Sequence, residues 1–559
     1  MRAPFALVLA TLTLACVRVA ANDDAVAPVG VTTKPLKAQW AYSRDGGKTF
    51  GTTPPQGAPP NAREGIVPLT FRGTFVVDDP KAAAGLWVRI AEPGDAPKAA
   101  ICTGDLTAAS GGYWKDLGFC PTLLNARVAL NGKPVKLTNG PMLYFWLPIE
   151  GELKKGENTV ELSGDCYTYW ASQAATAITA RLVVAAPQPA AIFNGPLLGD
   201  FGDGYFTLAC RTRLPAELVV EATPTDPPGK PVRAAAPRAT WHRVKVPLPA
   251  GTRAARYTLT SKVGTHESAS GPFAVKFPGA EFTFVGLGNV MAHKYGVEGW
   301  GAVSARAAKF GPAFVLNTGN CSEHGTWEFE WERRYFAPAG KLLASVPTFV
   351  TPCARDFAGA VNELHYTPAA DTYAHNWSKA VAPVRLIGLD GNQTWGADGA
   401  NTKWLDKELA AAKEKYVFVL EGYPGYSSGK HSNKLRAPIV QTREVILPLL
   451  AKHKVSALVS GFDPGYERCE PPADKGCTQL VTGAAGKETF QFSGTAMRLN
   501  PYGKGEGRDW AGTSGQGVRS FCVFEVTARG VELRAYALPG DPTGELKEID
   551  RKLFQPRDK

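Results

Sequence analysis

The C-terminal half of the chain alternates short apolar runs with longer amphipathic stretches. The apolar runs have the length of strands buried on both faces of a sheet, and they read FTFVGLG, AFVLNTG, PTFVT, VRLIGLD, YVFVLEG and SALVSGF. We expect helices between them, at 299–310, 328–345, 401–415 and 442–454. In the third, Leu405, Leu409 and Ala412 form one apolar stripe. This alternation predicts a layered α/β domain over residues 279–559, closed by two strands around Arg529-Gly530.

The preceding part of the chain has the two-residue period of strands. In residues 63–187, ARVALNGKPVKL alternates around Asn131-Gly132, which predicts a hairpin, and GELKKGENTVELSG predicts a second strand pair that turns at 155–158. Residues 188–278 hold four more short strands with turn residues between them. We therefore expect two all-β sandwiches before the α/β domain.

Both sandwiches resemble known modules. The patterns around LNGK and LKKGENTVEL resemble a galactose-binding-like jelly roll, and the run NGPLLGDFGDGYFTLACRTRLPAELVVEA resembles a fibronectin-III-like domain. The first resemblance implies sugar contacts through loop aromatics, for which Tyr113, Trp114, Tyr167, Tyr169 and Trp170 are candidates. Packing in the core or rim of the sandwich is the preferred explanation of these side chains.

The N-terminus has the features of an export signal. Arg2, the apolar run from Phe5 to Ala15 and the small residues before Asn22 predict a signal peptide over residues 1–21 and a secreted, periplasmic or cell-envelope location. A lipoprotein anchored at Cys16 is the alternative. Residues 22–62 are rich in Pro and Gly and include SRDGGKTF, a single Asp-box-like hairpin whose Asp45 is expected to bind backbone amides.

Composition narrows the classes of partner. The chain has 559 residues, 44% of them hydrophobic, which suffices for several packed domains. The net charge of +11 comes from scattered Lys and Arg, so it favours an anionic or glycan ligand and gives no nucleic-acid signature. No apolar stretch is long enough to predict a transmembrane segment.

Ten cysteines, one of them within the signal, make disulfides plausible in an exported protein. Cys469 and Cys477 flank a tight loop and are the first candidate pair, and Cys102 with Cys120 is the second. Cys321 with Cys353 requires that the fold bring their loops together. No Cys-x-x-Cys spacing suggests zinc.

Polar residues follow the ends of the predicted parallel strands, where α/β domains bind ligands. Five blocks stand there in order: GLGN, VLNTGNCSEHG, SVPTFVTPCARDF, YVFVLEGYPGYSSGKHS and ALVSGFDPGYER. Their order and flanks resemble the signature blocks of calcineurin-like metallophosphoesterases, and of purple acid phosphatases among them. The resemblance implies an α/β/β/α domain that hydrolyses phosphoric esters with a dinuclear centre of Fe, Zn or Mn.

The ligand positions of that resemblance carry the wrong side chains. Asp and His ligands are expected there, because two adjacent metal ions need anionic and imidazole donors. Amides, aliphatic groups, an aromatic ring and a cation replace them, at Asn289, Asn320, Ala354, Arg355, Gly422, Phe462 and Pro464. Leu287 takes the first position if the register slips by two residues. We therefore expect no dinuclear metal centre and no confident catalytic residue.

Other polar and aromatic residues near the strand ends could form a residual pocket. Two carboxylates with Asn oxygens could hold a single hard cation, although loop residues paired with Arg are the preferred explanation. Arg355 among aromatic rings could instead hold an anion or a sugar. The candidates are Asp356, Glu421, Tyr423, Tyr426, His431, Asp463, Tyr466 and Arg468, with Glu323, His324 and His293 nearby.

Three hypotheses follow from the sequence. The first is a secreted pseudoenzyme that keeps the phosphoesterase scaffold for binding. The second is an active phosphoric mono- or diester hydrolase with an altered metal site. The third is a structural cell-envelope protein.

Overall fold

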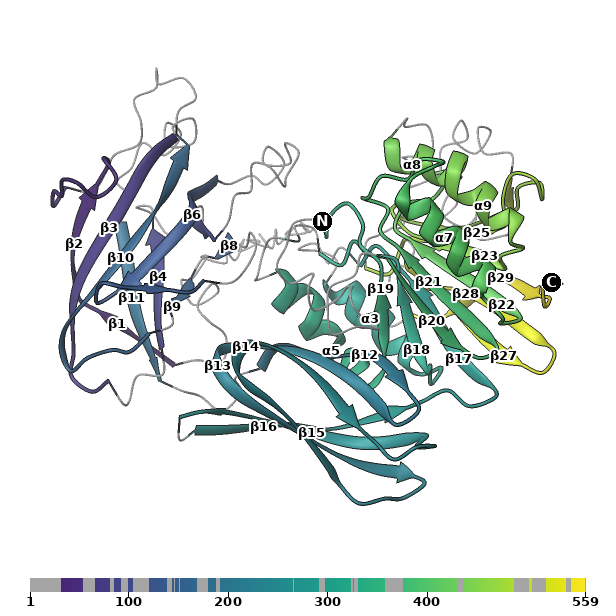
Figure 1. The fold of residues 1–559 in the computed structure, drawn as a ribbon, viewed down its shortest axis with the longest axis horizontal. Coiled ribbons are helices and arrows are strands. Elements are labelled where there is room, and N and C mark those ends of the chain that lie inside the picture. The colour runs from purple at the N-terminus through teal and green to yellow at the C-terminus, as the bar shows by residue number, and fades with distance from the viewer. Residues whose placement is uncertain are drawn as a thin grey trace, which may run out of the picture.

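The computed structural model is rich in β-structure (Figure 1). Among the residues it describes, the strands form five sheets, three before residue 278 and two after it. The described residues are 32–53, 66–80, 85–91, 99–103, 120–137, 143–144, 146–149, 151–167, 179–186, 192–264, 266–290, 297–322, 325, 330–356, 376–429, 436–486, 502–504, 519–538 and 544–557. In this part of the chain no helix is long and apolar enough to span a membrane.

Two sheets face each other in the N-terminal part. Phe71 on one and Val88 on the other belong to a single buried cluster, because alternate residues of each strand point inward. One sheet has the order β1-β11-β4-β9, and the other β2-β3-β10-β6-β5-β8 with β7 beside β6. The strands are β1 (Thr32–Leu36), β2 (Ala38–Ser43), β3 (Ile66–Val77), β4 (Gly85–Ala91), β5 (Ala99–Cys102), β6 (Cys120–Leu130), β7 (Lys133–Val135), β8 (Leu143–Tyr144), β9 (Leu147–Ile149), β10 (Gly156–Tyr167) and β11 (Thr179–Ala186).

The turns of this part test the predicted hairpins. Asn131 and Gly132 both have positive φ and join β6 to β7, so the first hairpin is confirmed. The second is wrong: residues 151–155 form no strand, and β10 begins at Gly156 and pairs with β3 and β6. Asp45 accepts backbone hydrogen bonds from Lys48 (2.9 Å) and Thr49 (3.0 Å), as expected of an Asp-box. β1 and β2 pair with β11 and β3, so residues 32–43 join these two sheets.

A third sheet links this part to the α/β part. Its path is β12-β13-β15-β16, with β14 beside the long β13. Tyr257 donates a hydrogen bond to the carbonyl of Ala344, and Lys379 pairs with Asp200 at 2.7 Å, so the sheet is fixed to the α/β part by buried polar contacts. The strands are β12 (Ile192–Gly202), β13 (Tyr205–Asp226), β14 (Val232–Pro247), β15 (Ala254–Val263) and β16 (His266–Lys276).

The last part has four layers. Its two sheets run β19-β18-β17-β27-β28-β29 and β20-β21-β22-β23-β25-β24-β26, with β17–β19 parallel in one and β21, β22, β23 and β25 parallel in the other. Phenylalanines fill the space between them: the Phe284 and Phe524 rings stack at 4.5 Å, and Phe418 meets both edge-on. The strands are β17 (Phe282–Leu287), β18 (Phe314–Asn317), β19 (Thr348–Val350), β20 (Trp377–Val381), β21 (Val384–Leu389), β22 (Tyr416–Glu421), β23 (Ala457–Ser460), β24 (Tyr466–Cys469), β25 (Thr478–Thr482), β26 (Gly503–Lys504), β27 (Arg519–Thr527), β28 (Gly530–Leu538) and β29 (Lys547–Phe554).

Helices cover the outer faces of both sheets (Figure 1). Leu405, Leu409 and Ala412 are buried against the second sheet, which confirms the apolar stripe. All four expected helices are present, two of them with a π-helical turn, and they give the expected α/β/β/α order. They are α3 (Val297–Ala308), η2 (Trp331–Phe336) continued by α5 (Ala337–Ser345), α7 (Ala400–Ala411), and α8 (Ala437–Gln441) continued by η3 (Thr442–Ile446) and α9 (Leu447–Lys452).

Candidate functional site

The carboxyl ends of the parallel strands of both sheets meet at one edge of the α/β part. Ala485, beyond β25, donates its backbone N–H to the carbonyl of Gly288, beyond β17, at 3.0 Å. Gly461 donates likewise to Gly422 at 3.2 Å. A Cβ on Gly288 would lie 1.9 Å from the Thr318 hydroxyl oxygen, so only glycine permits this approach of the loops. The predicted convergence of the blocks at one edge is therefore present.

Two asparagines occupy the first two ligand positions and bind each other. Asn320 donates its side-chain N–H to the side-chain oxygen of Asn289 at 2.6 Å, and its own side-chain oxygen accepts the backbone N–H of Arg355 at 2.9 Å. Asn289 and Asn320 are both buried. These oxygens, which a metal ion would need as ligands, are therefore engaged in hydrogen bonds within the protein.

Asp356 is fully buried and is surrounded by backbone donors. Its carboxylate accepts N–H groups from Asn320, from Cys321 at 2.7 Å and from Cys353 at 3.1 Å. Burial raises the pKa of Asp356 to about 7, against the lowering effect of these hydrogen bonds and of one from Ser322. The carboxylate thus holds the loop after β18 against the loop after β19.

An apolar cluster includes Phe462 and Ala354, two of the positions where the sequence resemblance implies ligands. The Phe462 and Tyr423 rings lie 4.8 Å apart, and both pack with Cys353 and Ile439, with Ala354 at the border. A Cβ on Gly422 would be 2.8 Å from the Cys353 sulfur, so no larger residue fits there without movement. Pro464 is buried as well. The sequence predicted the loss of ligands but not the apolar core that replaces them, because Ile439 lies on α8, far from the five blocks.

Three residues of this site have unusual backbone conformations. Asn289, Asn320 and Phe462 have φ angles of 46°, 51° and 66°. Asparagine tolerates the left-handed region, whereas a bulky phenylalanine there is strained. Such conformations gather at functional sites. The backbone conformation here is therefore typical of a functional site, although the side chains pack against one another.

Glu421 is a buried carboxyl group next to this cluster. Its Oε1 accepts a hydrogen bond from the Thr442 hydroxyl at 2.8 Å, and its Oε2 has no hydrogen-bond partner among the described residues. Burial, opposed by the Thr442 hydrogen bond and assisted by the nearby Asp390, raises the pKa of Glu421 to about 8. The group is therefore mostly protonated near neutral pH.

The other candidate residues are held by different partners. Asp463 is buried and lies against Gly429, while Tyr426 is half-buried between Tyr502 and Arg443. Gln479, which sequence reasoning missed, accepts the backbone N–H groups of Gly425 and Tyr426 and fixes that loop. His431, Glu323, His324 and His293 lie outside the described residues, as do Tyr113, Trp114, Tyr169 and Trp170, and the side chain of Tyr167 is not described either.

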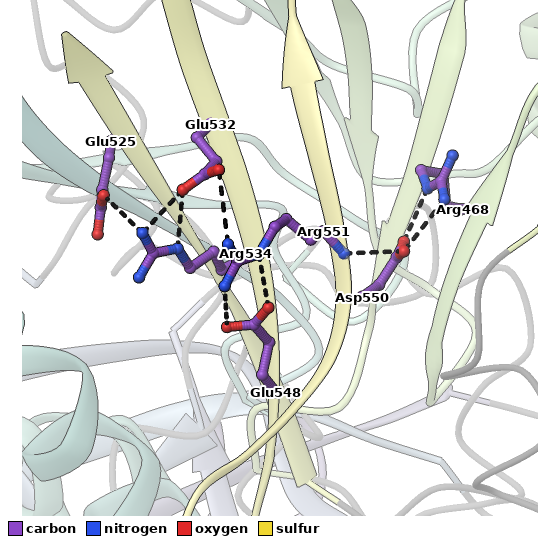
Figure 2. Close-up of polar contacts among 7 residues, drawn as sticks. All are labelled: Arg468, Glu525, Glu532, Arg534, Glu548, Asp550 and Arg551. Atoms are coloured by element: carbon purple, nitrogen blue, oxygen red, sulfur yellow. Dashed lines mark hydrogen bonds and ion pairs between the residues drawn. The ribbon is translucent and has the colours of Figure 1, made fainter.

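Tyr466 and Arg468 make their contacts with the other sheet. Figure 2 shows the Arg468 guanidinium facing Asp550 on β29. Its Nε donates to Oδ2 at 2.7 Å and its Nη2 to Oδ1 at 3.0 Å, and the Tyr466 hydroxyl donates to the same Oδ2. Tyr466 belongs to the core between the sheets, and neither residue is part of the Phe462 cluster.

The expected disulfides are absent from the described residues. Cys469 and Cys477 form no disulfide with each other, so that predicted pairing is wrong. The pairing of Cys102 with Cys120 lies outside the described residues, because the side chain of Cys120 is not described. Cys321 and Cys353 are brought together around Asp356, yet both are free. Burial holds the pKa of both thiols well above the usual value, so they resist conversion to thiolates.

The residues at this edge do not fit a dinuclear metal centre. Among the described residues no three His, Cys, Asp or Glu side chains gather in a way that could hold a metal ion, so Glu421, Asp356 and Asp463 do not form one site. Two hydrogen-bonded amides, a phenyl ring, a proline and a glycine supply no charged donor. We therefore assign no metal-dependent step to this edge.

One solved structure shares the fold of this chain. The structure of purple acid phosphatase PPD1 from yellow lupin (Lupinus luteus) seeds aligns with 87% of this chain and 93% of its own, at a TM-score of 0.54 and 12% identity. The structure of PhoD aligns with 66% of this chain and 94% of its own length, at a TM-score of 0.47 and 12% sequence identity. Tartrate-resistant acid phosphatase type 5 of Sus scrofa is 43% identical over 60 residues, which are 11% of this chain and 16% of that relative. No family model matches the chain.

Proposed function

Because the chain has the fold of a calcineurin-like metallophosphoesterase, as the lupin purple acid phosphatase does, we propose that it is an exported pseudoenzyme that uses this scaffold for binding. One observation carries the proposal: the edge where the metals of such an enzyme belong is closed by the protein's own Asn289–Asn320 hydrogen bond and by the Phe462 cluster. Hydrolysis by such a centre needs charged ligands for two metal ions, and at this edge the two amides bind each other while Phe462 packs in an apolar cluster.

The charges beside the closed edge favour an anionic ligand. Arg436 lies over the Phe462 ring at 5.3 Å, and Arg355 follows Ala354 at the border of the same cluster. Both arginines are half-buried, and the whole chain has a net charge of +11. Guanidinium groups bind phosphate, sulfate and carboxylate groups strongly, so we propose an anionic ligand, such as a phosphorylated or sulfated glycan.

The N-terminal sheets and the export signal complete the proposal. A galactose-binding-like sandwich would add a glycan contact, and a fibronectin-III-like module would support the α/β part. Export by residues 1–21 would place the protein outside the cytoplasm, where such glycans occur. An active hydrolase with an altered site gains no support, since Glu421, Asp356 and Asp463 are separate groups with separate partners.

The test combines turnover with binding on the purified full chain. We expect no hydrolysis of p-nitrophenyl phosphate or bis-p-nitrophenyl phosphate above buffer, with or without added Fe, Zn or Mn. We expect titration with heparin to give a saturable, salt-dependent signal that weakens in the double variant Arg355→Ala/Arg436→Ala. Metal-dependent turnover would contradict the proposal of a pseudoenzyme. Equal heparin affinity of the wild type and the double variant would contradict the proposed anion site.

A further inference from the structure

The loop after β18 has the geometry of a backbone anion site. Gly319 and Asn320 have successive positive φ angles of 84° and 51°. A residue with positive φ beside one with negative φ directs consecutive N–H groups into one concavity, a known anion-binding arrangement called a nest. Here Asn320 has a positive φ, and Cys321 after it does not. The N–H groups of Asn320, Cys321 and Ser322 all point to the same place, and the N–H of Cys353 joins them from the next loop.

The concavity is filled by a side chain of the same protein. Both oxygens of Asp356 are used: Oδ1 accepts the N–H of Cys321, and Oδ2 accepts those of Asn320 and Cys353. The fit is close, because a Cβ on Gly319 would lie 2.8 Å from Oδ2. Asp356 has no exposed surface, so the carboxylate is sealed inside.

The burial of the Asp356 carboxylate explains why it needs the backbone N–H donors. A carboxylate removed from water without donors would be strongly destabilised, and backbone N–H groups compensate for the lost hydration. The reverse also holds, since a loop that presents several inward N–H groups is unstable unless an acceptor occupies it. Loop and carboxylate therefore depend on each other.

We infer that residues 319–322 form an anion site whose resident ligand is the Asp356 side chain, and that removal of this side chain opens a site for a small carboxylate. Formate matches the carboxylate that Asp356 supplies and fits the volume that its deletion leaves. The inference concerns a site inside the protein and does not depend on the proposed function.

The experiment uses hydrogen–deuterium exchange of the full chain, read on peptides that cover residues 318–323. In Asp356→Ala we expect these amides to exchange about tenfold faster or more than in the wild type, because their acceptor is gone. Formate should restore slow exchange in Asp356→Ala, whereas chloride at equal ionic strength should not. Asp356→Leu is the matched control, because its side chain fills the space and leaves no room for formate.

Two results would overturn the inference. One is wild-type exchange of residues 318–323 in Asp356→Ala without any added anion. The other is an equal effect of formate on Asp356→Ala and Asp356→Leu. If Asp356→Ala does not fold on expression, its refolding from urea is compared in formate and in chloride. Native protein recovered in formate alone supports the site, and equal recovery in both salts, including none, contradicts it.

Discussion

The side-chain N–H of Asn320 donates a 2.6 Å hydrogen bond to the side-chain oxygen of Asn289, across the ends of β18 and β17. Two aspartates at this separation would repel each other unless a cation lay between them. An amide can donate to another amide, so the asparagines hold the strand ends together without a metal ion. The Asn289–Asn320 hydrogen bond therefore keeps the two strand ends close together and does not require a metal ion.

The Asn289–Asn320 bond can be measured by a double-mutant cycle. Asn320→Ala should lower the free energy of unfolding by about 1–3 kcal/mol, because the Asn289 oxygen and the Arg355 N–H lose their partner inside the protein. With Asn289→Ala, the coupling energy should be about 0.5–1.5 kcal/mol in urea denaturation. A coupling near zero would show that the two side chains do not act as a pair.

Phe462 should be the main apolar support of the closed edge. Phe462→Ala should lower the free energy of unfolding by about 3–5 kcal/mol, because it leaves a cavity among Tyr423, Cys353 and Ile439. Phe462→Gly should be no worse than Phe462→Ala, since glycine relieves the strain of a φ of 66°. Leu553→Ala, at a position that is 45% exposed, is the control. A larger loss with glycine than with alanine would contradict the strain.

The contribution of Glu421 and Asp356 to stability should fall as pH rises from about 4 to about 8, whereas His242, whose pKa burial lowers to about 4, acts in the opposite sense below its usual pKa. The pKa of Glu421 is about 8 and that of Asp356 about 7, each raised by burial above its usual value. The folded protein therefore binds more protons than the unfolded chain in this window, and the stabilisation present at low pH is lost as pH passes the raised pKa values. Glu421→Gln should flatten the slope of unfolding free energy against pH.

The exposed Glu444→Gln is the matched control for that slope, because it makes the same chemical change outside the buried edge. Urea denaturation at several pH values gives the slopes of the three proteins. A wild-type slope that is unchanged in Glu421→Gln would show that Glu421 does not bind its proton in the folded state.

The Arg468–Asp550 pair should matter more than the exposed pairs beside it. It joins β24 to β29, and its side chains are 15% and 6% exposed, whereas those of Arg551 and Glu548 are 54% and 33% exposed (Figure 2). Asp550→Asn should lower the free energy of unfolding by about 1.5–3 kcal/mol, because it weakens two charge-assisted hydrogen bonds to Arg468, which keeps Glu470 as a counter-charge. Glu548→Gln should cost about 0–1 kcal/mol. Similar losses in thermal or urea unfolding would contradict this ranking.

The fold of the α/β part could be predicted because its apolar runs and amphipathic stretches alternate clearly along the sequence. Wholly apolar runs such as 416–421 are buried on both faces, and the stripe of Leu405 and Leu409 fixes one helix face. The strand pair predicted for residues 151–164 is wrong, because the turn signal at Gly156 is compatible both with a hairpin and with the loop that leads into β10. There the side chain of Asn158 binds the backbone of Lys154 and shapes a loop that leads into β10.

The site could be predicted only in part. The five blocks predict which residues stand at the expected ligand positions, because those positions are local in the sequence. The partners that replace them come from elsewhere: Ile439 from α8, Asn392 on the Tyr423 hydroxyl, and Asp550 on Arg468. No local pattern marks such long-range contacts. The cysteines were misjudged for the same reason, since spacing along the chain does not set the geometry that a disulfide needs.

Metal content tests the central claim most directly. The purified full chain would be incubated with excess Fe, Zn or Mn, desalted, and measured by elemental analysis per mole of protein. The closed edge of Asn289, Asn320 and Phe462 predicts far less than one metal ion per chain, with the same value in Phe462→Ala. Two ions per chain, or one that disappears in Asn289→Ala/Asn320→Ala, would contradict the account.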